Sequence, residues 1–171
     1  MHVSFSDELT NLFPDSAPLP QSRKHWQSDL ARGGIAGVHI MIHGLDTKRA
    51  LRISIKKGTR KTDEIVLKRL LDLPVEHNTG LNGGTGTDNP HVIRKAPFRV
   101  FDALEPLSLM TLMPKGTLTV LRLECAVAGH ERAGDRTYTV TLAQGKDETT
   151  LAWTVKVHPV RLPAVGKESF P

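Results

Sequence analysis

The sequence predicts an all-β protein, a two-sheet antiparallel sandwich of immunoglobulin/fibronectin-like or jelly-roll-like type with a short N-terminal helix. Residues 137–142 and 151–157 alternate large apolar and polar side chains with a period of two, which is typical of antiparallel strands with one buried face. Gly145 between them marks a hairpin turn. Seven to nine such segments, separated by turn residues at short spacing, favour two packed sheets.

The N-terminal part predicts a strand over residues 2–5 and then one or two helical turns. Ser6 is a suitable helix cap, and Pro14 ends the helix. Residues 14–24 hold three prolines, so we expect an extended crossing there. Residues 38–43 and 51–56 both alternate, and we expect these two strands to pair with each other.

The middle of the chain is ambiguous at residues 64–76. Asp63 followed by an apolar run suits a capped helix, whereas a buried strand fits equally well, and the all-β context favours the strand. Residues 77–90 form a polar, glycine-rich loop of a length that is usually functional or mobile. Over residues 118–127, apolar residues of both parities predict a strand with a bulge or with both faces buried.

Composition favours a single domain over residues 1–171, since 39% hydrophobic residues suffice for one core. No apolar run approaches the ~18 residues of a membrane span, so we expect no membrane partner. The first residues show no secretion signal, which leaves the location open between the cytoplasm and a trimmed secreted protein. Cys125 lies in an apolar phrase and is expected to be a small core residue.

The net charge of +5 is concentrated in one place. Residues 48–69 carry +7, and the rest of the chain carries −2. The centre of this excess is the basic turn, which we define as Lys56, Lys57, Arg60 and Lys61. It suits an anion site for a phosphate backbone or a sulfated or uronic acid polymer, but it equally suits a solvated hairpin tip whose lysines discourage edge pairing. The second interpretation is favoured, and nucleic acid is therefore a disfavoured partner.

The remaining motifs favour neither a metal, a cofactor nor catalysis by this chain alone. The single glycine-aspartate unit at residues 83–88 lacks the stacked repeats that bind calcium. His39 and His43 lie four apart on a strand, roughly 13 Å, and are expected to face solvent. No serine sits in a nucleophile elbow, and no carboxylate pair is singled out for glycoside cleavage. Trp26 is the one large ring whose placement stays open.

Several phrases together resemble a known domain type. They are Phe13-Pro14-Asp15, Ala31-Arg32-Gly33-Gly34, the run from Val75 to Gly80, the run from Ala96 to Leu104, and the ending from Gly134 and Tyr138 to Leu162-Pro163. The chain resembles the N-terminal β-sandwich that precedes the catalytic (β/α)8 barrel, a TIM barrel, in bacterial glycoside hydrolases that are β-N-acetylgalactosaminidase-like. The spacing departs from the usual pattern, with Gly134 four residues before Tyr138.

The resemblance implies a non-catalytic accessory domain and a longer parent protein. Its implied partner is a downstream catalytic domain of the same chain, and carbohydrate would be bound where the sandwich approaches the glycan cleft. Loops at sandwich ends carry function, so the 77–90 loop is the segment expected to approach it. The expected glycan or interdomain contacts are Trp26, His77, Asn78, Asp88, Arg94 and Arg99. Two alternatives stay open: a free-standing module that binds anionic polymer through the basic turn, and an assembly domain with an exposed sheet edge.

Overall fold

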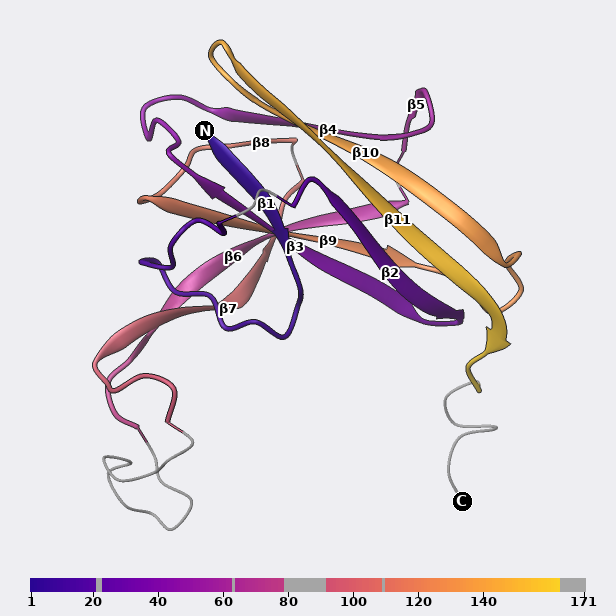
Figure 1. Ribbon diagram of the computed structural model, residues 1–171, viewed down its shortest axis with the longest axis horizontal. Coiled ribbons are helices and arrows are strands. Elements are labelled where there is room, and N and C mark those ends of the chain that lie inside the picture. The colour runs from indigo at the N-terminus through magenta and orange to yellow at the C-terminus, as the bar shows by residue number, and fades with distance from the viewer. Residues whose placement is uncertain (21–22, 63, 79–91, 109, 164–171) are drawn as a thin grey trace.

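Eleven strands build two facing sheets in the computed structural model, which describes residues 1–20, 23–62, 64–78, 92–108 and 110–163 (Figure 1). The strands are β1 (His2–Ser6), β2 (His25–Arg32), β3 (Ile35–His43), β4 (Leu51–Lys57), β5 (Arg60–Lys61), β6 (Ile65–Val75), β7 (Phe98–Pro106), β8 (Thr111–Leu112), β9 (Leu118–Ala126), β10 (Gly134–Gln144) and β11 (Asp147–Arg161). One sheet has the order β1-β3-β9-β6-β7, and the other has β2-β11-β10-β4-β5 with β8 beside β4. The predicted sandwich is confirmed, although β2 pairs with β11 in parallel.

The last two strands, β10 and β11, form the closing hairpin that their alternating pattern predicts. β10 and β11 pair antiparallel with Tyr138 opposite Trp153 and Val140 opposite Leu151. Gly145 makes the turn with a φ of 61°, in the left-handed region where glycine is favoured. The Tyr138 and Trp153 rings lie 5.8 Å apart, and these two largest fully buried side chains anchor the core.

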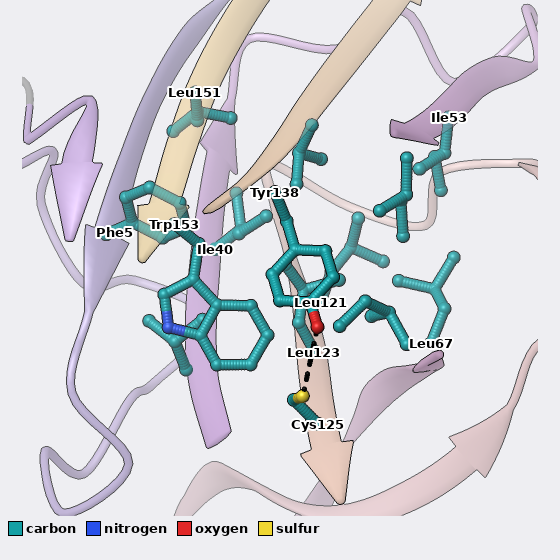
Figure 2. Packing of buried hydrophobic residues seen from close by; sticks show 14 of the residues in the cluster. Phe5, Ile40, Ile53, Leu67, Leu121, Leu123, Cys125, Tyr138, Leu151 and Trp153 are labelled. Carbon is teal, nitrogen blue, oxygen red and sulfur yellow. Dashed lines mark hydrogen bonds between the residues drawn. The ribbon is translucent and has the colours of Figure 1, made fainter. Parts of the chain in front are cut away.

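The main core lies between the two sheets and consists of the side chains that point inward from both of them (Figure 2). Phe5 and Ile40 of one sheet face Leu151 and Trp153 of the other, and all four are almost completely buried. Cys125 is also in this core, as expected, and its Sγ lies 3.3 Å from the Tyr138 hydroxyl. Burial raises the pKa of the Cys125 thiol, so it stays protonated.

The predicted N-terminal helix is wrong, because no residue of 7–20 is helical. The Asp7 carboxylate accepts hydrogen bonds from the backbone N–H of Leu9 (2.9 Å) and Thr10 (2.7 Å), which closes a turn instead. The segment then crosses the outer face of the five-stranded sheet and covers a second, smaller core. That core consists of Leu12, Met41, Leu70, Leu118 and Val120. It accounts for the apolar residues of both parities in β9.

Two further expectations change in the structure. The strands at residues 38–43 and 51–56 do not pair: β3 lies between β1 and β9, whereas β4 lies between β10 and β5 in the other sheet. Alternation defines which face of a strand is buried but says nothing of its neighbour, and here the turn between the two strands crosses from sheet to sheet. The ambiguous segment 64–76 is strand β6, because β7 and β9 supply partners on both sides.

His39 is not solvent-facing, and that expectation is wrong. Its side chain is only 5% exposed and lies 3.5 Å from the Arg122 guanidinium on the face that the N-terminal segment covers. Burial, and then the charge of Arg122, hold the pKa of His39 below its ordinary value. His43 is partly buried and its Nε2 lies 2.9 Å from the backbone oxygen of Ser16.

The sandwich has two ends that differ in what they present. We call the exit end the one that holds the β2–β3 turn, the β4–β5 turn, the β9–β10 loop and Arg161 at the end of β11, on the right of Figure 1. Ile65 begins β6 near this end, opposite Cys125. β6 then runs ten residues to Val75, about 33 Å at strand rise. The loop end, formed by residues 77–78 and 92–97, therefore lies at the far side, at the lower left.

Candidate functional site

At the loop end, Asn78 closes the base of the glycine-rich loop. Its Nδ2 donates a hydrogen bond to the Arg94 carbonyl (3.0 Å), and its Oδ1 accepts one from the Ala96 backbone N–H (2.6 Å). The amide thus ties together the two chain segments that flank the loop. Residues 79–91, with Asp88 among them, lie outside the described residues, and so does most of the loop expected to approach a cleft.

Arg94 is bound to a partner within the chain. Its guanidinium donates hydrogen bonds to both carboxylate oxygens of Asp15 (2.7 and 2.6 Å) and lies 4.6 Å from the centre of the Phe13 ring. The Phe98 ring packs edge-on against Phe13 at 5.7 Å. The hydrogen bonds from Arg94 lower the pKa of Asp15. Arg94 therefore fixes the N-terminal crossing to the loop base, and a glycan contact by Arg94 stays a prediction.

The other two expected contacts at this end differ in their surroundings. Arg99 on β7 forms an ion pair with Asp72 on β6 and donates a second hydrogen bond to the Asp72 carbonyl (2.8 Å). His77 follows β6 and is exposed. The structure thus brings His77, Asn78, Arg94 and Arg99 to one end of the sandwich. Both arginines there are paired with carboxylates of this chain, and Asn78 is bonded to its backbone.

Trp26 is not part of this group. It lies on β2, the edge strand of the six-stranded sheet, is partly buried and packs against the main core. Together with His25, Gln27, Ala152 and Thr154 it lines an open pocket of about 320 Å³. Trp26 therefore packs against the core and also borders polar groups that are able to hydrogen-bond a sugar.

The basic turn forms at the exit end, and one of its cations is paired. Lys57 Nζ donates hydrogen bonds to both carboxylate oxygens of Glu64 (2.8 Å each), which also accepts one from the buried Tyr138 hydroxyl (2.9 Å). The hydrogen bonds from Lys57 hold the pKa of Glu64 below its ordinary value. Burial raises the pKa of Tyr138, which keeps the phenol as a donor.

A groove of about 370 Å³ lies beside this turn. We call it the exit-end groove, and it is lined by Lys57, Glu131, Arg132, Ala133, Gly134, Asp135 and Arg136. Arg136, at the start of β10, forms an ion pair with Glu131 of the β9–β10 loop (2.8 Å). The sequence did not single out Arg132 or Arg136, because they lie more than 70 residues beyond the basic turn and only the pairing of β10 with β4 brings them beside Lys57.

The described residues offer no site of recognisable catalytic chemistry. No group of three or more histidine, cysteine or carboxylate side chains among them is placed to hold a metal ion. Glu64 and Glu124 both have a lowered pKa, which is the opposite of what a general acid in glycoside cleavage requires. Within the described part of the chain, no helix is long and apolar enough to cross a membrane.

The fold has a counterpart among solved structures. A family 123 glycoside hydrolase from Clostridium perfringens matches with a TM-score of 0.70 and 10% sequence identity, over 94% of this chain and 28% of the enzyme's chain. The β-sandwich described above thus has the fold of a part of a much longer glycoside hydrolase. This chain spans little more than a quarter of that enzyme.

Two other solved structures match with lower TM-scores. The CooA pilin subunit of enterotoxigenic Escherichia coli has a TM-score of 0.36 and 12% identity, over 93% of this chain and 100% of the pilin. The seventh PapD-like domain of human CEP192 has 0.37 and 10%, over 95% and 87%. No family model matches the sequence, and no curated protein does.

Proposed function

We propose that the chain is a non-catalytic accessory β-sandwich of a carbohydrate-active enzyme, which packs on a downstream catalytic domain of the same protein. The observation that carries this proposal is the likeness of 94% of the chain to 28% of a family 123 glycoside hydrolase. The remainder of that enzyme leaves room for a separate catalytic domain, in which the acid and base residues would lie.

The exit end supports a docking role. The Leu162 backbone N–H donates a hydrogen bond to the Arg32 carbonyl (2.8 Å), and Arg32 Nη2 donates one to the Pro159 carbonyl (2.5 Å). The segment that follows β11 is thereby held against the β2–β3 turn. Ile35, Val160 and Leu162 expose 65%, 64% and 46% of their surface at this end, where a neighbouring domain would bury them.

The finer role, shaping the glycan cleft, is proposed for whichever end reaches that cleft. Residues 77–90 stay a candidate, but their base lies about 33 Å of strand from the exit end. The exit end is the better candidate, because a domain that follows β11 meets it first.

The gene that encodes this chain provides the test. The protein encoded up to the next stop codon should be produced beside the 171-residue chain, and both assayed on chromogenic β-N-acetylhexosaminides. We expect hydrolysis by the longer protein and none by the short one. Hydrolysis by the 171-residue chain, or a stop codon directly after Pro171, would contradict the proposal. In the second case, the mass in solution distinguishes an assembly domain from a monomeric binding module.

A further inference from the structure

The exit-end groove gathers cations from two parts of the sequence that lie far apart. Lys57 ends β4, and Arg132 and Arg136 come from the β9–β10 loop and the start of β10. Tyr138 of β10 lies opposite Lys57 in the sheet, so the loop and the turn are side by side. Electrostatic interaction of both Lys57 and Arg136 with Glu64 agrees with this proximity.

Not all of these cations are neutralised. Glu64 pairs with Lys57, and Glu131 pairs with Arg136. Among the described residues of the exit-end groove and the basic turn, the cations that form no ion pair are Lys56, Arg60, Lys61 and Arg132, all of them exposed. Asp135 also lines the groove, and Asp63 lies outside the described residues. Six cations thus stand against three described carboxylates.

We propose that the exit-end groove and the basic turn together bind an acidic glycan, with the sulfate or carboxylate groups of successive sugars held by Arg132, Arg60 and Lys61. The carbohydrate nature of the ligand rests on the proposed function, whereas the anion site rests on the cluster of charges itself. A guanidinium binds a planar carboxylate or a sulfate through two parallel hydrogen bonds, which suits Arg60 and Arg132 to this task.

The composition of the groove favours a glycan over nucleic acid. None of its seven lining residues is aromatic. Proteins that bind single-stranded nucleic acid stack bases on aromatic rings, and the groove has no such platform. An acidic glycan requires only cations and hydrogen-bond donors at the spacing of its charges. The open shape of the groove permits a chain to pass through rather than end in it.

Binding to the 171-residue chain itself tests the proposal. The probes are a heparin hexasaccharide, a hexamer of galacturonate, a neutral chitin hexamer and a single-stranded DNA dodecamer, titrated by calorimetry between 50 and 300 mM NaCl. The variant is Arg60→Gln with Lys61→Gln and Arg132→Gln. The control is Lys24→Gln with Lys115→Gln and Lys146→Gln, three exposed cations outside the groove with the same change in net charge.

We expect at least one acidic hexamer to bind, with an affinity that falls as salt rises, and the chitin hexamer not to bind. The groove variant should lose tenfold or more in affinity. The slope of log K against log salt concentration should become shallower by about 0.7–0.9 per lost contact, for a glycan whose charge density resembles that of nucleic acid. The control should lose less than threefold. Preference for the sulfated or the carboxylate probe identifies the anion.

Three results would overturn the proposal. They are tighter binding of the DNA than of both glycans, equal losses in the groove variant and the control, and no binding at 50 mM NaCl by a chain that is folded by circular dichroism. The two tests can fail independently. If the longer protein hydrolyses its substrate but the exit end binds no glycan, the accessory-domain proposal holds and the glycan-binding proposal does not.

Discussion

At the scale of single residues, Tyr138 connects the buried core to the charged exit end. Its ring is fully buried, and its hydroxyl donates to Glu64 while lying 3.3 Å from the Cys125 thiol. Tyr138→Phe leaves the ring packing intact but removes the donor to a carboxylate. Since hydrogen bonds to charged groups contribute about 1.5–3 kcal/mol, we expect a loss of about 2 kcal/mol in the free energy of unfolding, measured with urea.

The matched control for Tyr138→Phe is Thr137→Val on the same strand. Thr137 is exposed, and its hydroxyl lies 3.1 Å from that of Thr154 across the hairpin. We expect this variant to change stability by less than about 0.5 kcal/mol. A loss for Tyr138→Phe no larger than that of Thr137→Val would show that the hydroxyl adds nothing to the core.

Glu124 gives a prediction for pH. Burial alone would raise its pKa, but the ion pairs with Lys68 (2.7 Å) and Arg122 (2.6 Å) outweigh burial, and its folded pKa lies below the ordinary value of 4.5. The ion pairs thus stabilise the fold fully above about pH 4.5, and that stabilisation is lost as the pH falls through the lowered pKa. Glu124→Gln should therefore lose less stability between about pH 5 and 3 than the wild type, as measured by urea unfolding at each pH.

The wild type must also be more stable than Glu124→Gln at pH 7 for this account to hold. If the two proteins have parallel pH profiles, the ion pairs do not contribute to acid sensitivity. Glu148→Gln, at an exposed position of the closing hairpin, serves as the control and should follow the wild type at every pH.

At the scale of elements, the N-terminal segment acts as a cover rather than a helix. Leu12 is 3% exposed over the outer core of the five-stranded sheet, whereas Leu9 is 93% exposed. Leu12→Ala opens a cavity against Met41 and Val120, and we expect it to cost about 2–4 kcal/mol in the free energy of unfolding. Leu9→Ala should change it by less than about 0.5 kcal/mol. Equal effects of the two substitutions would show that the segment does not cover a core.

The same segment shows why local patterns predicted some elements and not others. Ser6, Asp7 and Glu8 suit the start of a helix, yet Asp7 uses its carboxylate to close a turn, and Leu12 is then buried by the outer face of a distant sheet. The period-two strands near residues 138 and 153 were predicted because their pattern and turn are local. The partners of β3 and β4 were not, since pairing depends on which residues far along the chain complete each sheet.

At the scale of the whole molecule, the contacts expected from the sequence lie mainly at the loop end, whereas the docking and glycan-binding roles that we propose lie at the exit end. The sequence did not predict the bonds of Arg94 to Asp15 and of Asn78 to Ala96. They form because the fold brings segments together that are far apart in the sequence. The basic turn was visible as a run of charge. Its second side, Arg132 and Arg136, depends on the pairing of β10 with β4, which no local pattern encodes.

The exit end exposes large apolar side chains. Ile35 and Val160 are 65% and 64% exposed there, and Ile93 is 73% exposed at the loop end. All three side chains already face water in the isolated sandwich. The double variant Ile35→Asp with Val160→Asp and the single variant Ile93→Asp should therefore each leave the unfolding midpoint of the 171-residue chain almost unchanged.

In the longer gene-encoded protein, only the double variant at the exit end would place carboxylates against an apolar partner surface. We expect the double variant to lower the temperature of thermal unfolding of the longer protein by several degrees, with Ile93→Asp as the unaffected control. Equal sensitivity of both variants, or of neither, would contradict docking of the proposed catalytic domain at the exit end.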